Sequence, residues 1–168
     1  MIHYYDWAEY QSKMHSNKIA ITDYFLNKRM SYRELNSSAC KIANFLQSKD
    51  IGHSDRIAIL SKNHSIFFEL QFACSKLGSI MVPLNWRLTA NELSFILNDC
   101  EPSLLIVDDC FETIANQLRS LIPKVTILFF NSEGKPSEFQ KNINDCSSEF
   151  KKASLSLNDL IMIMYTSG

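Results

Sequence analysis

The sequence predicts an α/β fold with a largely parallel sheet covered by helices on both faces. Short apolar runs alternate with longer segments of helical periodicity along most of the 168 residues. Most of these runs are apolar throughout, which is typical of strands buried on both sides. Parallel strands need crossover connections, usually helices, so the alternation predicts a single α/β unit over residues 1–168.

The predicted helices and strands follow in order along the chain. A short amphipathic helix is expected over residues 4–14, with Tyr4, Trp7, Ala8 and Met14 on one side. Strands are expected at Ile19–Phe25, Arg56–Leu60, Ser79–Leu84, 103–109, 125–130 and Asp159–Tyr165. Further helices are expected at 31–49, 61–78, 89–98 and 111–122, the last halting before Pro123.

Two of these helices carry a start signal. Ser31 with Glu34, and Thr89 with Glu92, have the spacing of a capping box. In this motif the hydroxyl accepts an N–H of the first turn, and the glutamate accepts the N–H of the cap residue. Both helices are therefore predicted to begin at these residues.

Two polar stretches are predicted to connect the elements. Residues 27–30 are expected to form a turn toward another short strand. Polarity rises and periodicity fades over Asn131–Asn158, so this stretch is predicted to be a surface connection with one helical turn.

Composition and charge exclude several classes of function. Hydrophobic residues make up 46% and charged residues 21% of the chain, as in an ordinary globular protein. The formal net charge of −1 gives no electrostatic basis for binding nucleic acid or an anionic membrane. No apolar run approaches the roughly 18–20 residues of a membrane helix, and the N-terminus lacks the pattern of a signal peptide. A cytoplasmic protein without a transmembrane segment is expected.

The cysteines and histidines do not predict a metal site or a catalytic residue. The five cysteines make no C-x-x-C pair, so they are expected to be reduced and to act as small core residues: Cys40, Cys74, Cys100, Cys110 and Cys146. The four histidines are scattered, and the chain has no G-x-S-x-G motif.

An acidic pair follows one of the predicted buried strands. Asp108 and Asp109 lie at its carboxyl end, where α/β sheets usually bind ligands. Such a pair can hold Mg²⁺, but the expected further aspartate, Asp159, precedes its strand instead of following it. The favoured interpretation is that Asp109 caps the next helix.

A cationic loop follows another predicted strand. Asn85, Trp86 and Arg87 come directly after Ser79–Leu84 and precede a capped helix. Arginine is a natural donor to carboxylate or phosphate groups, so Arg87 is a candidate ligand-binding residue. The alternative is that Trp86 packs on the sheet edge and Arg87 pairs with a surface acid.

The chain ends in a small-residue loop after the last predicted strand. Thr166, Ser167 and Gly168 suit a phosphate loop, because hydroxyl and N–H groups can face anionic oxygens and glycine permits close approach. The tripeptide alone is weak evidence, and no P-loop template fits the chain.

Three stretches together resemble the N-terminal part of adenylate-forming (AMP-binding) enzymes, the superfamily of acyl-CoA synthetases, adenylation domains and luciferases. They are the segment from Lys18 to Asn63 with its Tyr-x-Glu-Leu helix, the run "GSIMVPLNWRLTANEL", and the terminal "DLIMIMYTSG". The resemblance spans nearly the whole chain in order. Asn85-Trp86-Arg87, where peptide-synthetase domains typically carry Asp-Pro-x-Tyr-Pro, favours the acyl-CoA synthetase (fatty-acid–CoA ligase) branch.

The resemblance implies a first subdomain of an adenylate-forming N-terminal domain and a two-step reaction. A fatty or aryl acid reacts with ATP, assisted by Mg²⁺, to give acyl-AMP and pyrophosphate, and CoA then displaces AMP. It implies contact with ATP phosphates for Thr166, Ser167 and Gly168, and contact with CoA phosphates, more weakly, for Arg87. The rest of the phosphate loop, the adenine and ribose motifs and the catalytic lysine have no counterpart in the chain.

The resemblance therefore implies that these 168 residues are a fragment of the parent ligase and inactive alone. Two alternatives remain open: an adenylation domain that loads a carrier protein, and a free-standing, non-catalytic α/β interaction domain. Acyl specificity and oligomeric state do not follow from the sequence.

Overall fold

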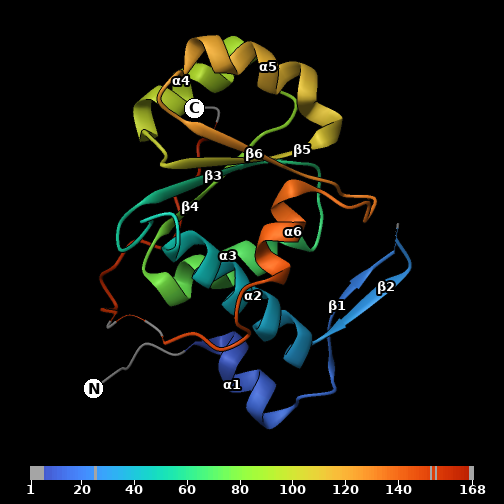
Figure 1. Ribbon diagram of the computed structural model, residues 1–168. Helices are drawn as coiled ribbons and strands as arrows, with labels where there is room; N and C mark the ends of the chain where they lie inside the picture. The colour runs from blue at the N-terminus through green and yellow to red at the C-terminus, as the bar shows by residue number, and fades with distance from the viewer. Residues whose placement is uncertain (1–5, 25, 152, 154, 167–168) are drawn as a thin grey trace.

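The computed structural model describes residues 6–24, 26–151, 153 and 155–166, which form a sheet between two helical layers, with a hairpin beside them (Figure 1). The described helices are α1 Trp7–Met14, α2 Tyr32–Gln47, α3 Ile66–Leu77, α4 Ala90–Cys100, α5 Glu112–Leu121, α6 Glu138–Asn144 and the 3₁₀ turn η1 Asp109–Phe111. The described strands are β1 Ile19–Asp23, β2 Lys28–Ser31, β3 Arg56–Leu60, β4 Ile80–Leu84, β5 Leu104–Asp108 and β6 Thr126–Phe130.

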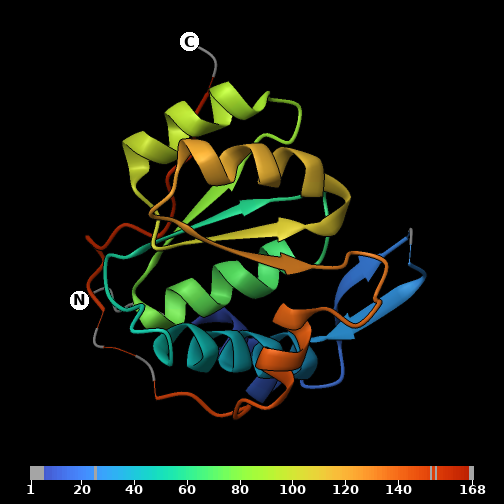
Figure 2. The same cartoon turned by 45° about the horizontal axis from the view of Figure 1, so that its top comes forward.

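Within the described residues the main sheet is four-stranded and parallel, in the order β4-β3-β5-β6 (Figure 2). The chain passes from β3 to β4 and then returns across β3 to β5. Helices α2, α3 and α6 lie on one face of the sheet, and α4 and α5 on the other (Figure 1). The predicted α/β fold with both faces covered is confirmed.

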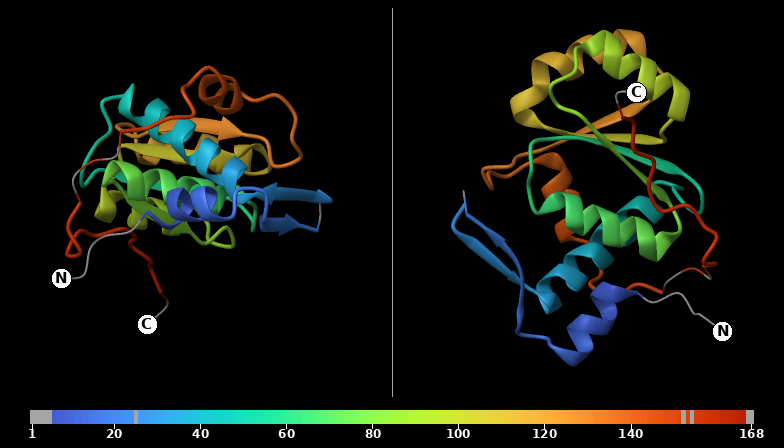
Figure 3. Two further views of the ribbon diagram at one scale, coloured as in Figure 1. Left: turned by 90° about the horizontal axis from the view of Figure 1, so that it is seen from below. Right: turned by 180° about the vertical axis from the view of Figure 1, so that it is seen from behind.

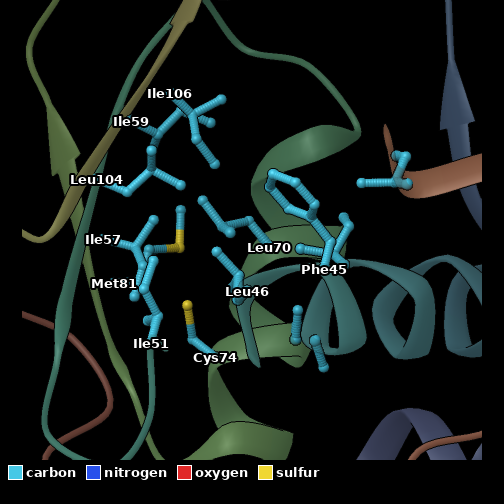
Figure 4. Packing of buried hydrophobic residues seen from close by; sticks show 14 of the residues in the cluster. Phe45, Leu46, Ile51, Ile57, Ile59, Leu70, Cys74, Met81, Leu104 and Ile106 are labelled. Carbon is cyan, nitrogen blue, oxygen red and sulfur yellow. The ribbon is translucent and has the colours of Figure 1, made fainter. Parts of the chain in front are cut away.

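Two hydrophobic clusters fill the spaces between the sheet and the helical layers. Strand β3 contributes to both, since Ile57 and Ile59 face one cluster and Ala58 and Leu60 face the other. Figure 4 shows the first cluster, in which Leu46 of α2 and other helical side chains meet the strand residues. Burial on both faces explains why β3 is apolar from Ile57 to Leu60 without alternation.

The two predicted capping boxes are present. At the start of α2 the Ser31 N–H donates to Glu34 Oε2 at 2.7 Å, and the Glu34 N–H donates to Ser31 Oγ at 3.3 Å. At the start of α4 the Thr89 N–H donates to Glu92 Oε2 at 2.8 Å. The paired bonds lower the pKa of both glutamates, through the Ser31 side chain for Glu34 and chiefly through the backbone N–H of Thr89 for Glu92.

The N-terminal helix is where predicted, but its apolar side is not. Trp7 is 62% and Met14 59% exposed, and Ala8 alone of the predicted side is buried among the described residues. A polar anchor replaces the expected apolar one, because Asp6 caps α1 and its carboxylate accepts a hydrogen bond from buried Lys76 of α3 at 2.6 Å.

The antiparallel hairpin β1–β2 turns earlier than predicted. Strand β1 ends at Asp23, and Lys28–Met30, predicted as turn residues, pair in β2. The Asp23 carboxylate accepts the N–H of Leu26 at 3.0 Å, and Asn27 has a left-handed φ of 48°. The turn is therefore made by an aspartate and an asparagine, without glycine.

The stretch Asn131–Asn158 is more than a surface connection, which corrects the prediction. It contains α6, which is capped by Ser137 and buries Phe139 and Ile143 in the first cluster. The Phe139 ring meets Phe45 of α2 edge to face, with 5.6 Å between ring centroids. Only two apolar residues, spaced by four, carry this packing, which is too few for periodicity to reveal.

Residues Asp159–Tyr165 were predicted to form a buried strand, and this prediction is also wrong. Met162 makes a single parallel bridge with Met81 of β4, in which the Met81 N–H donates to the Ile161 carbonyl at 3.1 Å and the Ile163 N–H donates to the Met81 carbonyl at 3.0 Å. Leu160 and Met164 are 64% and 67% exposed. Among the described residues this segment has a strand neighbour on one side only, and Met162, Ile163 and Tyr165 are no more than partly buried where they pack against the two clusters.

Candidate functional site

The candidate site lies at the carboxyl edge of the main sheet. In a parallel sheet all strands end at this edge, and the loops after β3, β4, β5 and β6 converge there. The helices that follow the neighbouring strands β3 and β5, α3 and α5, lie on opposite faces (Figure 1). This is a point at which connections diverge, where open α/β sheets bind ligands.

The loop after β4 presents a cation on an aromatic ring. The side chain of Asn85 accepts the Arg87 N–H at 3.1 Å, which sets a tight turn. The Trp86 ring rests against Phe111, with centroids 6.2 Å apart, and the Arg87 guanidinium stacks 4.2 Å from the Trp86 centroid. Trp86 thus packs at the sheet edge, as one alternative predicted.

The same alternative predicted that Arg87 pairs with a surface acid, and this part is wrong. Arg87 is exposed, and within the described part of the chain no carboxylate lies at ion-pair distance from it. The indole ring supplies the stabilising contact that a surface acid was expected to supply.

A second cation, Lys62, joins this group although the sequence did not single it out. It directly follows Ser61 at the end of β3, and its Nζ lies 5.4 Å from the centroid of the Trp86 ring. The sequence alone does not show that Lys62 lies near Arg87. That follows only from the strand order, in which β3 and β4 are neighbours.

Asp108 and Asp109 do not act as predicted. Helix α5 begins at Glu112 after η1 and has no side-chain cap, so Asp109 does not cap it. Asp108 is 1% exposed and accepts the N–H of Ser132, while Asp109 accepts the side-chain amide of Asn131. Both carboxylates therefore face the loop after β6.

The acidic pair also does not fit a Mg²⁺ site. The described residues hold no group of three or more His, Cys, Asp or Glu side chains able to bind a metal. Asp108 accepts a backbone N–H and Asp109 a side-chain amide, so both carboxylates are engaged by donors of the loop after β6.

The thiols are poor nucleophiles. All five cysteines lie in the described ranges and are free, with Cys40, Cys74 and Cys100 buried as predicted, whereas Cys110 is exposed. Burial raises the pKa of Cys74 to about 12, and burial together with Asp108 raises the pKa of Cys110 to about 11. Neither thiol is a thiolate near neutral pH.

The predicted phosphate-loop residues lie at the C-terminal end of the described residues and beyond it. Thr166 is exposed, and Ser167 and Gly168 lie outside the described residues. The Tyr165 hydroxyl donates to Asp99 on α4, and the segment runs past the sheet toward that helix (Figure 3). Burial, with the Asp99 carboxylate, raises the pKa of Tyr165. Among the described residues, no hydrogen bond joins Thr166 to Arg87.

A separate hollow of about 510 Å³ lies between the hairpin and the start of α3. Its lining includes Ile21, Tyr24, His64, Phe67 and Phe68. None of the predicted site residues lines it, although its Asn63, His64 and Ser65 belong to the loop after β3. None of the described helices is both long enough and apolar enough to cross a membrane.

Comparison with known families identifies the fold. The model of the family described as AMP-binding enzyme matches residues 8–168. Among solved structures, a Mycobacterium tuberculosis fatty acyl CoA synthetase superimposes with a TM-score of 0.86 at 25% identity, over 96% of this chain and 32% of that one. An anthranilate CoA ligase in complex with anthranoyl-AMP gives a TM-score of 0.90 at 24% identity, over 100% of this chain and 32% of that one.

Curated relatives agree. The chain is 30% identical over 141 residues to a long-chain-fatty-acid–CoA ligase of Mycobacterium tuberculosis, covering 83% of this chain and 27% of that protein. It is 30% identical over 127 residues to an indoleacetate–CoA ligase of Aromatoleum aromaticum, covering 76% of this chain and 24% of that protein. A fatty acid–[acyl-carrier-protein] ligase of Streptomyces coeruleorubidus is 33% identical to this chain over 100 residues, covering 60% of this chain and 19% of that protein.

The chain thus spans about a fifth to a quarter of the length of these relatives. The family match covers nearly all of its residues, and the structure has the α/β architecture of the N-terminal domain of adenylate-forming enzymes. The chain belongs to the AMP-binding enzyme family, on its acyl-CoA ligase-like side.

Proposed function

We propose that this chain is the first α/β unit of an acyl-CoA synthetase, an enzyme that joins a fatty or aryl acid to CoA with the cleavage of ATP. The observation that carries the proposal is the family match over residues 8–168 together with the position of Arg87. Arg87 is exposed at the carboxyl edge of the sheet, stacked on Trp86 and without a carboxylate partner among the described residues.

The proposed reaction has two steps. A carboxylate oxygen of the acid attacks the α-phosphorus of ATP, the bond to the bridging oxygen breaks, and pyrophosphate leaves. The CoA sulfur then attacks the acyl carbon, its proton is lost to solvent or a base, and AMP leaves with the former carboxylate oxygen. Mg²⁺ supplies charge neutralisation at the ATP phosphates when bound; the acidic pair at this edge does not hold it.

The chain's own residues have binding roles in this proposal. Thr166, with Ser167 and Gly168, contacts the phosphates of ATP through hydroxyl and N–H donors. Arg87 contacts the phosphates of CoA, because a guanidinium presents several N–H donors to phosphate oxygens in a fixed geometry. No catalytic residue is assigned, and the 168 residues alone are expected to be inactive. A cytoplasmic location fits five free thiols.

A second acceptor is a candidate in place of CoA. One relative is named a fatty acid–[acyl-carrier-protein] ligase and is 33% identical over the shared 100 residues. A pantetheine thiol on a carrier protein would undergo the same second step, so the two acceptors differ only in what binds beyond the thiol.

The test is an assay of the protein isolated from its native cell and of the 168-residue chain, both with ATP, Mg²⁺ and a panel of fatty and aryl acids. Pyrophosphate exchange reports the first step, and mass spectrometry of the thioester formed with CoA or with a holo carrier protein reports the second. The native protein is expected to exchange pyrophosphate and to acylate CoA, and the short chain to do neither.

Two results would contradict the proposal. Acyl-AMP formation by the 168-residue chain alone would refute the inactive-unit interpretation. A native protein that forms neither acyl-AMP nor thioester with any acid of the panel would favour a non-catalytic interaction domain.

A further inference from the structure

Lys62 and Arg87 form a pair of cations around one indole ring at the carboxyl edge of the sheet. The Lys62 Nζ lies 5.4 Å and the Arg87 Cζ 4.2 Å from the centroid of the Trp86 ring. Both distances end at the same centroid, so the two charges lie within about 10 Å of each other, close to the Debye length at physiological salt. The charges come from loops that follow adjacent strands, β3 and β4.

Two like charges this close repel each other unless something offsets the repulsion. The Trp86 ring does so in part, because cations are attracted to the face of an aromatic ring. Within the described ranges no carboxylate lies at ion-pair distance from either cation. The pair is therefore exposed, concentrated and without an ion-pair partner among the described residues, which is an arrangement that favours a bound anion.

The neighbouring acids make their hydrogen bonds with other groups. Asp108 is buried and accepts the backbone N–H of Ser132, and Asp109 accepts the side-chain amide of Asn131. Both contacts lie on the β6 side of β5, whereas Lys62 and Arg87 follow the strands on the other side of β5. Cys110, between the two groups, is a neutral thiol because its pKa is raised to about 11.

The Trp86 ring is itself held in place. It rests on Phe111, whose side chain is 9% exposed and belongs to the second hydrophobic cluster, with Trp86 packed against that cluster. The turn made by Asn85 fixes the backbone of Arg87. Three adjacent strand ends thus contribute one group each: Lys62 after β3, Trp86 with Arg87 after β4, and Phe111 after β5.

We propose that Lys62 is the second cation of a phosphate-binding site that it forms with Arg87, and that Trp86 is the positioning residue that holds both. The inference rests on the proposed function for its choice of phosphate, the 3′-phosphate and diphosphate of CoA. Lysine is a compact point charge and arginine a planar fork, so Arg87 sets the orientation of a phosphate and Lys62 adds charge from the side.

The experiment measures binding to the full 168-residue chain at low salt by isothermal titration calorimetry. The probes are 3′,5′-ADP, which is the nucleotide half of CoA, with ATP and inorganic phosphate as the two other phosphate sources. Lys62→Ala and Arg87→Ala are each expected to weaken 3′,5′-ADP binding by about tenfold, as expected for one charge-assisted contact. Trp86→Ala is expected to weaken it at least as much, and Trp86→Phe less, because a ring is kept.

A matched control is present elsewhere in the chain. Lys49 also has its Nζ over an aromatic ring, 5.7 Å from the centroid of Phe45, but on the helical layer away from the strand ends. Lys49→Ala is expected to leave binding unchanged. Circular dichroism and thermal unfolding of each variant separate a lost site from a lost fold.

The outcomes separate this inference from the proposed function. Tighter binding of ATP than of 3′,5′-ADP, with the same dependence on Lys62 and Arg87, would assign the site to the other nucleotide and overturn the choice of CoA. Equal effects of Lys62→Ala and Lys49→Ala would overturn the role of Lys62. In the native enzyme Lys62→Ala is expected to raise KM for CoA about tenfold with pyrophosphate exchange unchanged.

If the native protein makes no thioester while 3′,5′-ADP binding depends on Lys62 and Arg87, the proposed function fails and the site stands. If thioester forms and Lys62→Ala changes neither KM for CoA nor 3′,5′-ADP binding, the site fails and the function stands.

Discussion

The β6 side and the β4 side of the main sheet are covered by different kinds of contact. Strand β6 is followed by α6, which returns to the sheet and buries Phe139 at 0% and Ile143 at 2% exposure. Strand β4 is flanked by the terminal segment, which makes one bridge through Met162 and leaves Met164 67% exposed. The β6 side is covered by fully buried apolar side chains, whereas the β4 side is covered by the partly buried Met162, Ile163 and Tyr165 and two backbone hydrogen bonds. The difference predicts which edge controls the stability of the chain.

Of the contacts that cover the two edges, those on the β6 side are expected to contribute most to stability. Phe139→Ala removes a fully buried ring that meets Phe45 edge to face, and should lower the free energy of unfolding by about 3–5 kcal/mol. Urea unfolding followed by circular dichroism measures it. Phe95→Ala, at a position 75% exposed, is the control and should change stability by less than about 0.5 kcal/mol. A Phe139 effect below about 1 kcal/mol would show that α6 is not part of the core.

A proline substitution compares the terminal segment with the sheet itself. Ile163→Pro removes the N–H that donates to the Met81 carbonyl at 3.0 Å, and should lower the free energy of unfolding by about 1 kcal/mol. Ile59→Pro in β3, which pairs with strands on both sides, should abolish the folded state. The comparison fails if the two prolines have similar effects on thermal unfolding.

A smaller change is expected from the contact between the terminal segment and α4. Tyr165→Phe deletes the hydroxyl that donates to Asp99, and should cost less than about 1 kcal/mol because the pair is partly solvated. Hydrogen exchange at the Ile163 amide should accelerate, while exchange in β3 should not. Tyr24→Phe, at a site 89% exposed, serves as the control. Unchanged exchange at Ile163 would mean that this bond does not hold the segment.

The smallest effect should be the dependence of the terminal segment on pH. The N–H of Ser156 and then His53, whose Nε2 lies 3.3 Å from the carboxylate, lower the pKa of Asp159 below its usual 3.8. A lowered pKa in the folded state stabilises it above pH 3.8, and this contribution is lost as the pH falls through the folded value. NMR shifts of Ile161 should follow this titration, and Asp159→Asn should abolish it. Loss of the segment's contacts as the pH rises above neutrality instead would contradict this assignment.

Periodicity and capping chemistry were enough to predict most of the fold. The strands Arg56–Leu60 and Ser79–Leu84 are apolar after their first residue, and the boxes at Ser31 and Thr89 are local hydrogen-bond patterns that sequence spacing determines. Two of the wrong predictions have one cause. Helix α6 and the segment around Met162 depend on which surface lies opposite them, and a tertiary partner leaves no trace in local periodicity.

The candidate site was predictable in part for a similar reason. Arg87 could be singled out because it follows a predicted parallel strand directly, and strand ends share an edge in any order. Lys62 follows a strand just as directly, but its meeting with Trp86 requires that β3 and β4 be neighbours. The role of Thr166 with Ser167 and Gly168 stays a prediction.

The buried ion pair between Asp6 and Lys76 makes Asp6 a residue that a redesigned chain should keep. A shortened version starting at Trp7 would lose only one described residue, yet Lys76, whose side chain is 3% exposed, would keep Asn36 at 2.7 Å and lose its counter-charge. An ammonium group left without its partner in that position destabilises a fold by about 3–5 kcal/mol. Purification tags and fusion partners should therefore be joined ahead of Asp6 and should not replace it.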